Sequence, residues 1–187
     1  MNYKIIESGS YGNATIVEDM ILIDCGVSFK KLRDCYKNLK LVLLTHIHSD
    51  HFNKTTIKRL AQERPTLRFG CRDWLVHDLV MCGVDRKNID IFDPVCNFKY
   101  SNKLLLTTFD LQHDDQNCGY KIMINDKKYF YATDTTLWPD AALQRPGGQR
   151  RGHSGAAGPD LFRGQQPARA HQEGRAERRS AAGRPQR

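Results

Sequence analysis

The stretch THIHSDH, residues 45–51, places three histidines and an aspartate close together in the chain. It follows the apolar run KLVLL at residues 40–44, which predicts a strand buried on both faces. In an extended backbone, side chains two residues apart point to the same side, so His46 and His48 can converge on one ion. Imidazole nitrogens are good ligands for zinc and similar metals. The end of this strand is therefore a predicted metal site.

Asp50 and His51 come after the strand has turned into a polar loop, where they face a neighbouring position. A carboxylate and a further imidazole there predict a second place for a cation. The alternative is a polar loop with surface histidines, which is the ordinary interpretation of a lone histidine. Four ligand-type residues at this spacing after an apolar strand favour metal binding instead.

The rest of residues 1–138 predicts a mixed α/β domain in which helices pack outside sheets. Two β-branched runs that flank Glu18 and Asp19 predict a hairpin. Ser28 is the expected N-cap of the first helix, and Gly83 follows the last one. The predicted strands are 3–7, 14–18, 20–24, 40–46, 66–71, 104–113, 118–125 and 129–134, and the predicted helices are 28–39, 53–63 and 73–83.

The motif His-x-His-x-Asp-His after a buried strand resembles the signature of the metallo-β-lactamase fold. Further motifs extend the resemblance over residues 1 to about 137. LIDCG (22–26) is similar to the family's apolar-x-Asp-x-Gly turn, and SGSYGN (8–13) resembles the YycJ/WalJ-type branch, which includes phage-encoded members. The resemblance implies a four-layer αββα sandwich, incomplete here at its C-terminal end.

The same resemblance implies roles for individual residues. His46, His48 and His113 would bind a first metal, and Asp50 and His51 a second. Asp134, which ends the run YFYATD, would bridge the two metals. Asp24 would hold the ligand loop through hydrogen bonds. His77 lies inside a predicted helix and is interpreted as structural.

One ligand of the family pattern is missing. The family supplies a last histidine to the second metal, well downstream of the bridging aspartate. Only His153 and His171 lie downstream here, and neither follows an apolar strand. We therefore expect neither of them to be that ligand.

The implied activity is hydrolysis by a hydroxide bound to two divalent metal ions, zinc first, with manganese or iron as alternatives. Asp50 would orient the nucleophile or accept its proton. DNA or another phosphodiester is the expected substrate, because the YycJ/WalJ-type branch is similar to DNA exonucleases. The alternatives are a hydrolase of lactones, thioesters or cyclic phosphodiesters, and an inactive metal-binding fragment.

Composition divides the chain near residue 138. Residues 139–187 are mostly Arg, Ala, Gly, Gln and Pro, contain no Lys, and carry most of the positive charge. Such a stretch has little to bury and is expected to be disordered. It could be a basic tail that binds nucleic acid or membrane, a linker, or out-of-frame translation. The complete change from Lys to Arg favours the last.

Other features predict the compartment. Six cysteines without a CxxC pair indicate reduced thiols in a cytoplasmic protein. No transmembrane helix, signal peptide, membrane contact or protein partner is expected. Residues 1–138 are nearly balanced in charge, so net charge is poor support for a nucleic-acid surface.

Overall fold

The computed structural model describes residues 2–136, which form two β-sheets and two α-helices. The prediction for residues 139–187 lies outside the described residues. The first sheet has the order β1-β2-β3-β4-β5-β6, and the second the order β10-β9-β8-β7. The strands are β1 (Tyr3–Glu7), β2 (Ala14–Val17), β3 (Ile21–Ile23), β4 (Leu41–Leu43), β5 (Arg68–Cys71), β6 (Ile89–Ile91), β7 (Asn97–Lys99), β8 (Leu104–Leu111), β9 (Asn117–Ile124) and β10 (Lys127–Tyr131).

The first sheet begins with the predicted hairpin. β2 and β3 pair antiparallel around Glu18 and Asp19, whose φ angles of 50° and 54° fit a tight turn between twisted strands. β4, β5 and β6 then add in parallel, each beside the strand before it. β4 is buried throughout, as its apolar sequence predicts, and it ends just before the histidine motif.

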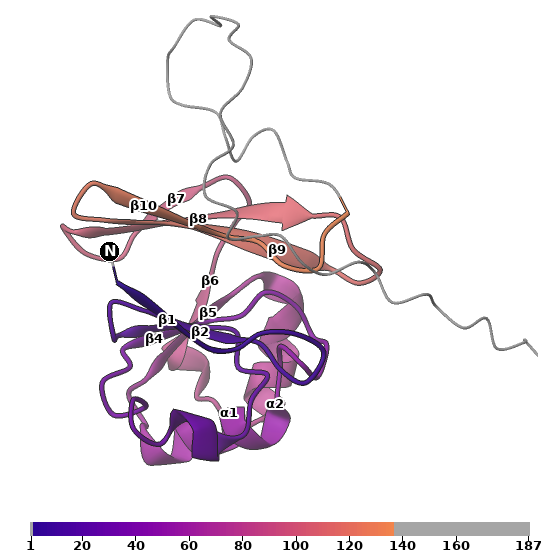
Figure 1. The fold of residues 1–187 in the computed structure, drawn as a ribbon. Coiled ribbons are helices and arrows are strands. Elements are labelled where there is room, and N and C mark those ends of the chain that lie inside the picture. Colours follow the sequence, from indigo (N-terminus) through magenta and orange to yellow (C-terminus); the bar gives the residue numbers. More distant parts are fainter. Residues whose placement is uncertain (1, 137–187) are drawn as a thin grey trace, which may run out of the picture. The chain divides into compact units, whose positions relative to one another are not determined.

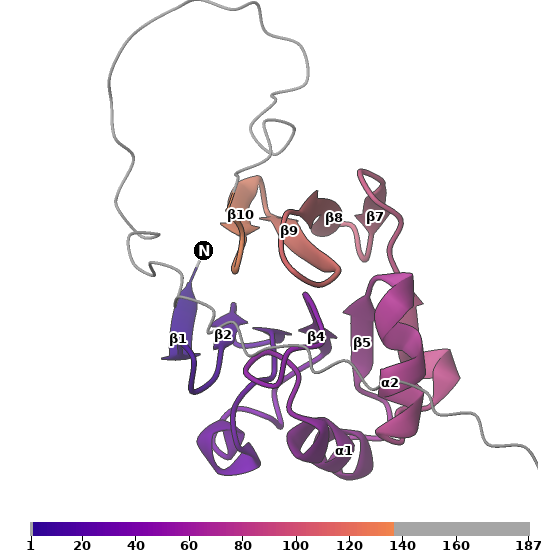
Figure 2. The same cartoon turned by 90° about the vertical axis from the view of Figure 1, so that its right-hand side faces the viewer.

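Two helices cover one face of the first sheet (Figures 1 and 2). α1 (Lys54–Glu63) begins at Asn53, whose side chain accepts a hydrogen bond from the backbone N–H of Thr56. α2 (Val76–Met81) ends before Gly83, whose φ of 85° suits a residue without a side chain. Both confirm predicted helices.

The helix predicted for residues 28–39 is wrong. Only a single turn of 3-10 helix forms, at Phe29–Leu32, and Ser28 makes no capping hydrogen bond with its side chain. Arg64, at the end of α1, donates hydrogen bonds to the backbone carbonyls of Tyr36 and Leu39 at 2.7 and 3.0 Å. These bonds satisfy carbonyls that an irregular segment leaves unpaired.

The second sheet packs against the other face of the first, and apolar side chains from both sheets form one shared cluster. Tyr120 from β9 is fully buried there, and its hydroxyl donates a hydrogen bond to the carbonyl of Leu44 beyond β4. The mixed class with two facing sheets is confirmed. Residues 2–136 supply three of the four expected layers, because no helix among them covers the outer face of the second sheet.

Three backbone segments meet at Gly26. Its N–H bonds to the carbonyl of Asn13 at 2.9 Å, and the N–H of Asn13 bonds to the carbonyl of Asp50 at 2.6 Å. A Cβ atom added at Gly26 would lie 1.6 Å from the Asp50 carbonyl oxygen. The glycine of LIDCG is therefore needed so that the ligand loop can pack directly against β3.

Replacing Gly26 by alanine should disrupt the domain, because the clash is with backbone that has no room to move. We expect Gly26→Ala to cost about 3 kcal/mol or more of unfolding free energy in urea titrations. Gly83→Ala is the matched control, since nothing lies within 4 Å of its added Cβ and only the left-handed backbone is strained. It should cost about 1–2 kcal/mol. Equal losses in the two variants would contradict the packing argument.

Candidate metal centre

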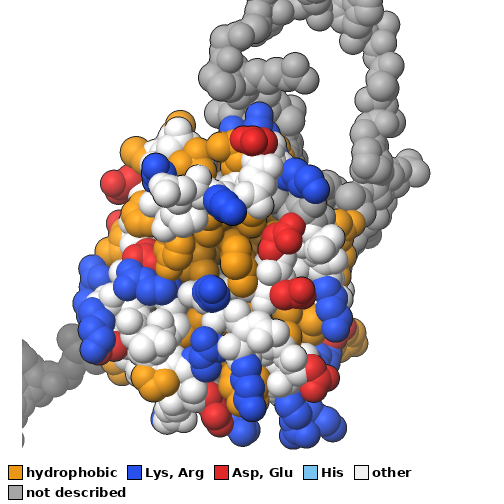
Figure 3. All heavy atoms as spheres, turned by 90° about the vertical axis from the view of Figure 1, so that its left-hand side faces the viewer, with side chains coloured by type: hydrophobic (Ala, Val, Ile, Leu, Met, Phe, Trp, Pro, Cys, Tyr) orange, Lys and Arg blue, Asp and Glu red, His pale blue; other side chains and the backbone are white. Residues whose placement is uncertain are grey.

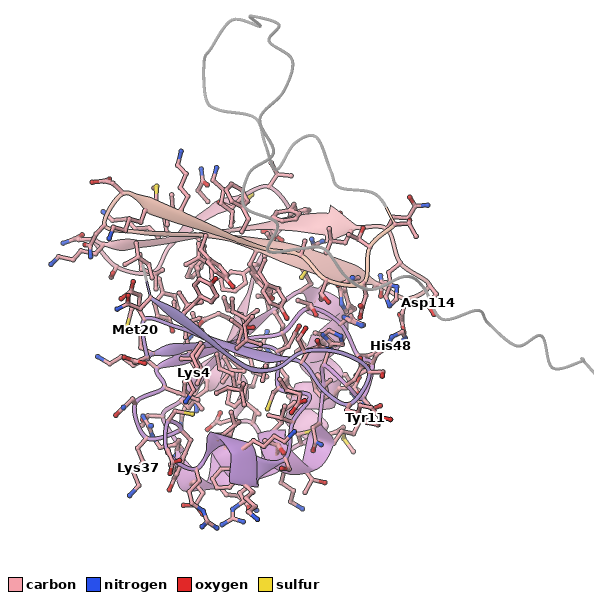
Figure 4. The ribbon with its side chains drawn as sticks, viewed as in Figure 1. Lys4, Tyr11, Met20, Lys37, His48 and Asp114 are labelled. Carbon is pink, nitrogen blue, oxygen red and sulfur yellow. The ribbon has the colours of Figure 1, made fainter. Side chains whose placement is uncertain are left out.

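The predicted ligands gather because each follows a strand that ends at the same edge of the domain. His46 comes after β4, His113 after β8, and Asp134 after β10. Figure 4 shows His48 and the neighbouring Asp114 at this end of the molecule. Residues from both sheets thus meet where the first sheet faces the second.

Three histidines form the first group of ligand atoms. One ring nitrogen from each of His46, His48 and His113 lies within 4.8 Å of the others. Nδ1 of His48 and Nε2 of His113 approach to 3.2 Å. The ring of His46 lies 4.8 Å from that of His48 and 4.9 Å from that of His113, centroid to centroid. His113 therefore lies close to the motif, although it comes from the other sheet.

A second group shares His46 with the first. It consists of His46, His51 and Asp134. Oδ2 of Asp134 lies 2.8 Å from Nε2 of His51 and 3.5 Å from Nε2 of His46. Oδ2 of Asp50 is 3.4 Å from the same nitrogen of His51. Asp134 therefore contacts His51 and also His46, the histidine that the two groups share.

The residues present fit a cation. Nε2 of His46 is buried and has no hydrogen-bond partner among the described residues, which is costly for a polar atom unless something else occupies its lone pair. Burial, together with the neighbouring His51, lowers the pKa of His46 to about 4. The ring is then neutral at pH 7 and its nitrogen is available as a ligand.

Asp24 contacts His51 of the second group and is fully buried. Its Oδ2 is 2.7 Å from Nδ1 of His51 and accepts a hydrogen bond from the hydroxyl of Tyr131 at 3.1 Å. The backbone N–H of Thr45 donates to Oδ1 at 2.9 Å. A carboxylate on one ring nitrogen fixes the histidine and directs the other nitrogen toward a metal. Asp24 thus contacts both the ligand loop and His51 through hydrogen bonds.

His51 lies between two carboxylates, those of Asp24 and Asp134, which favour a positive charge on its ring. Burial lowers the pKa of His51, but the carboxylates of Asp24 and Asp134 outweigh it and raise the pKa to about 10. The hydrogen bond from His51 in turn lowers the pKa of Asp134 to about 2. A proton on His51 therefore occupies the place that a cation would take.

The backbone is strained at two aspartates of the cluster, Asp24 and Asp134. Asp24 has a φ of 59° and Asp134 a φ of 49°, in a region that residues with side chains rarely adopt. Such strain is retained where surrounding structure over-determines it, and it concentrates at functional sites.

Sequence reasoning missed two neighbours of the cluster. Asn13 is buried, and its Nδ2 donates to Oδ2 of Asp50 at 3.2 Å and lies 2.8 Å from Nε2 of His51. Asp114 is exposed, with Oδ1 at 2.9 Å from Nε2 of His113 and 3.8 Å from Nε2 of His48. The loop SGSYGN and the pair of aspartates after His113 were the only signals for them.

Other candidates lie elsewhere. His77 is exposed on α2, away from the cluster, and His153 and His171 are outside the described residues.

Two surface hollows of about 330 and 180 Å³ lie near Ser101 and near Pro65. Neither of these two hollows is lined by a residue of the cluster. All six cysteines are free in the structure.

A model of the beta-lactamase superfamily domain matches residues 19–150. The chain belongs to the beta-lactamase superfamily. This is the fold family that the motif at residues 45–51 led us to expect. No curated protein matches the chain by sequence. In residues 2–136 no helix has the length and apolarity needed to cross a bilayer.

Solved structures support the fold of this superfamily member. The metallo-beta-lactamase fold protein YhfI from Bacillus subtilis is 18% identical with a TM-score of 0.59, covering 74% of this chain and 64% of that one. Igni18, a metallo hydrolase from the archaeon Ignicoccus hospitalis, is 19% identical with a TM-score of 0.57, covering 75% and 64%. The short form of human tRNase Z is 14% identical with a TM-score of 0.51, covering 66% and 64%. The chain thus spans 64% of the length of each of these proteins.

Metal binding at the second group should depend on pH through His51. A cation must displace the proton that Asp24 and Asp134 hold there, so its apparent affinity rises about tenfold per pH unit between about pH 7 and 9. It levels off above the pKa of about 10. Zinc titrations against a competing chelator check this, with His77→Ala as a control that removes an exposed imidazole. An affinity that stays constant over this range would contradict the assignment.

Proposed function

We propose that this superfamily member is a metal-dependent hydrolase of phosphodiesters, with DNA as its principal substrate. The single observation that carries the proposal is the pair of ligand groups that share His46. His46, His48 and His113 would hold one divalent cation, and Asp50 and His51 a second, with Asp134 between them. Zinc suits this mixture of imidazole and carboxylate, and manganese or iron are alternatives.

A pair of divalent cations supplies a water of lowered pKa and stabilises negative charge on the oxygens of a phosphodiester. The chain's own residues then place the reacting groups. Asn13 donates to Oδ2 of Asp50 and so holds that carboxylate beside His51. Asp50 is partly exposed, with 28% of its side chain accessible, and it is positioned to accept the proton of the attacking water.

The finer assignment follows the sequence resemblance. We infer a YycJ/WalJ-type, phage-related branch and an exonuclease activity, formed by a domain over residues 1–138. Six free cysteines suit a reducing compartment, which supports a cytoplasmic location.

Figure 3 shows one face of the molecule, on which Lys and Arg side chains are spread with Asp and Glu between them. This face is the left-hand side of Figure 1, away from His48 and Asp114, and the proposal depends on the metal groups.

A second candidate function is hydrolysis of a neutral ester such as a lactone or thioester. The side chain of Asp114 is 76% exposed beside His48 and His113, and its carboxylate opposes a polyanionic substrate. This negative charge beside the metal groups favours a neutral substrate. The two functions differ in the substrate that the same groups would accept.

Kinetics on the zinc- or manganese-loaded full chain test the proposal. We expect hydrolysis of bis(p-nitrophenyl) phosphate and of linear DNA, and complete loss with a chelator. Asp50→Asn should lower kcat by about 10²–10⁴-fold, because it removes a proton acceptor. His77→Ala, outside the cluster, should behave as the wild type.

Two results would overturn the proposal. Turnover of a lactone or thioester without turnover of any phosphodiester would select the second candidate. A loaded chain that hydrolyses neither class would be an inactive metal-binding fragment, in line with its spanning 64% of the related structures.

A further inference from the structure

The loop between β1 and β2, residues 8–13, holds the most exposed aromatic side chain among the large hydrophobic residues of the described chain. Tyr11 is 94% exposed at the tip of this loop. Its neighbours Gly9 and Gly12 have φ angles of 124° and 143°, which a residue with a side chain adopts only with strain. The two glycines therefore allow the tight turns that place Tyr11 at the loop tip, where its side chain faces solvent.

Hydrogen bonds close this loop on itself. The N–H of Gly12 donates to the carbonyl of Gly9 at 2.9 Å. Oδ1 of Asn13 accepts from the N–H of Gly9 at 3.0 Å, and its Nδ2 donates to the Gly9 carbonyl at 3.1 Å. The ring of Tyr11 is thus presented on a fixed base, which reduces the entropy lost when it contacts a ligand.

The loop is attached directly to the metal centre. The backbone N–H of Asn13 bonds to the carbonyl of Asp50, and its side chain bonds to Oδ2 of the same residue. Tyr11 lies two residues before Asn13, and consecutive Cα atoms are about 3.8 Å apart. Figure 4 shows Tyr11 at the same end of the molecule as His48 and Asp114. A ligand held at Asp50 is therefore within reach of the tyrosine ring.

The surroundings of Tyr11 select the kind of ligand. The side chain of Tyr11 is 94% exposed, so the faces of its ring are open to solvent. An acyl chain or a lactone substituent binds best inside an enclosing apolar pocket. An open, flat ring instead suits another flat ring that stacks on it, as bases do on the aromatic side chains of single-strand-binding proteins.

We propose that Tyr11 is a stacking platform for a nucleobase of the substrate, which makes this chain selective for single-stranded or frayed nucleic acid. The inference rests on the proposed phosphodiesterase function. A base inside a duplex is already stacked on both sides, whereas an unpaired base has a free face for Tyr11. The phosphodiester next to that base would then lie at Asp50.

Binding of two matched ligands tests this inference. One is a short single-stranded oligothymidylate with phosphorothioate linkages, which slow its cleavage, and the other is an abasic chain of equal length and charge. For the zinc-loaded full chain, Tyr11→Ala should weaken binding of the oligothymidylate about 5- to 150-fold. The abasic chain should bind the variant and the wild type equally. Tyr11→Trp should restore the preference for bases, because tryptophan also offers a flat ring.

Tyr3→Ala is the matched control. Tyr3 is 43% exposed on β1 and its ring packs against Tyr129, so the variant should bind both ligands like the wild type. Thermal unfolding and zinc content of Tyr11→Ala should also match the wild type, since the side chain packs against little.

The outcomes separate this inference from the proposed function. Equal weakening of both ligands by Tyr11→Ala, or no weakening of either, would overturn the stacking role and leave the phosphodiesterase proposal intact. A wild type that binds neither ligand, while carrying its metals, would overturn both.

Discussion

The buried carboxylate of Asp24 is the interaction on which the arrangement of this site depends. It lies at the end of β3 with no exposed surface, and it accepts hydrogen bonds from Thr45 and Tyr131. A buried carboxylate is costly unless such partners satisfy it. Because Thr45 precedes the histidine motif and Tyr131 ends β10, one side chain connects the ligand loop to both sheets. His51 completes the set at 2.7 Å, and this contact fixes the direction of its other nitrogen.

The positions of the remaining ligands follow from the way the strands end. β4, β8 and β10 deliver His46, His113 and Asp134 to one edge, and the shared apolar cluster keeps the two sheets together there. Gly26 lets the ligand loop approach β3 closely enough for Asp24 to reach it. The strained backbone at Asp24 and Asp134 is stabilised by the same contacts. The ligand groups thus form because the packing of the two sheets brings the ends of β4, β8 and β10 together.

The sequence alone was sufficient for the parts of the site that lie close together in the chain. The motif at residues 45–51 predicted His46, His48, Asp50 and His51 because its spacing and the preceding apolar strand are local signals. His113 and Asp134 required a resemblance to known proteins, since no spacing relates them to the motif. Asn13 and Asp114 contact the ligands only through the tertiary fold, so the loop SGSYGN and the aspartates after His113 did not by themselves indicate these contacts.

The same limit explains the errors in the fold. The apolar spacing over residues 28–39 suits a helix, yet Arg64 from α1 bonds to carbonyls of this segment and stabilises an irregular path. β6 and β7 are three residues each and were missed, because such short strands carry little periodicity. In the first case a long-range contact overrides local preference, and in the second the local signal is too weak to read.

Metal content measured by elemental analysis tests the central claim most directly, because the two ligand groups would hold one ion each. After saturation with zinc and removal of excess, the wild type should hold about two ions per chain. His46→Ala and His48→Ala should each lose the ion of the first group and keep the other, and His77→Ala should hold as many as the wild type. Zinc content that is absent in the wild type, or unchanged by His46→Ala, would contradict the account.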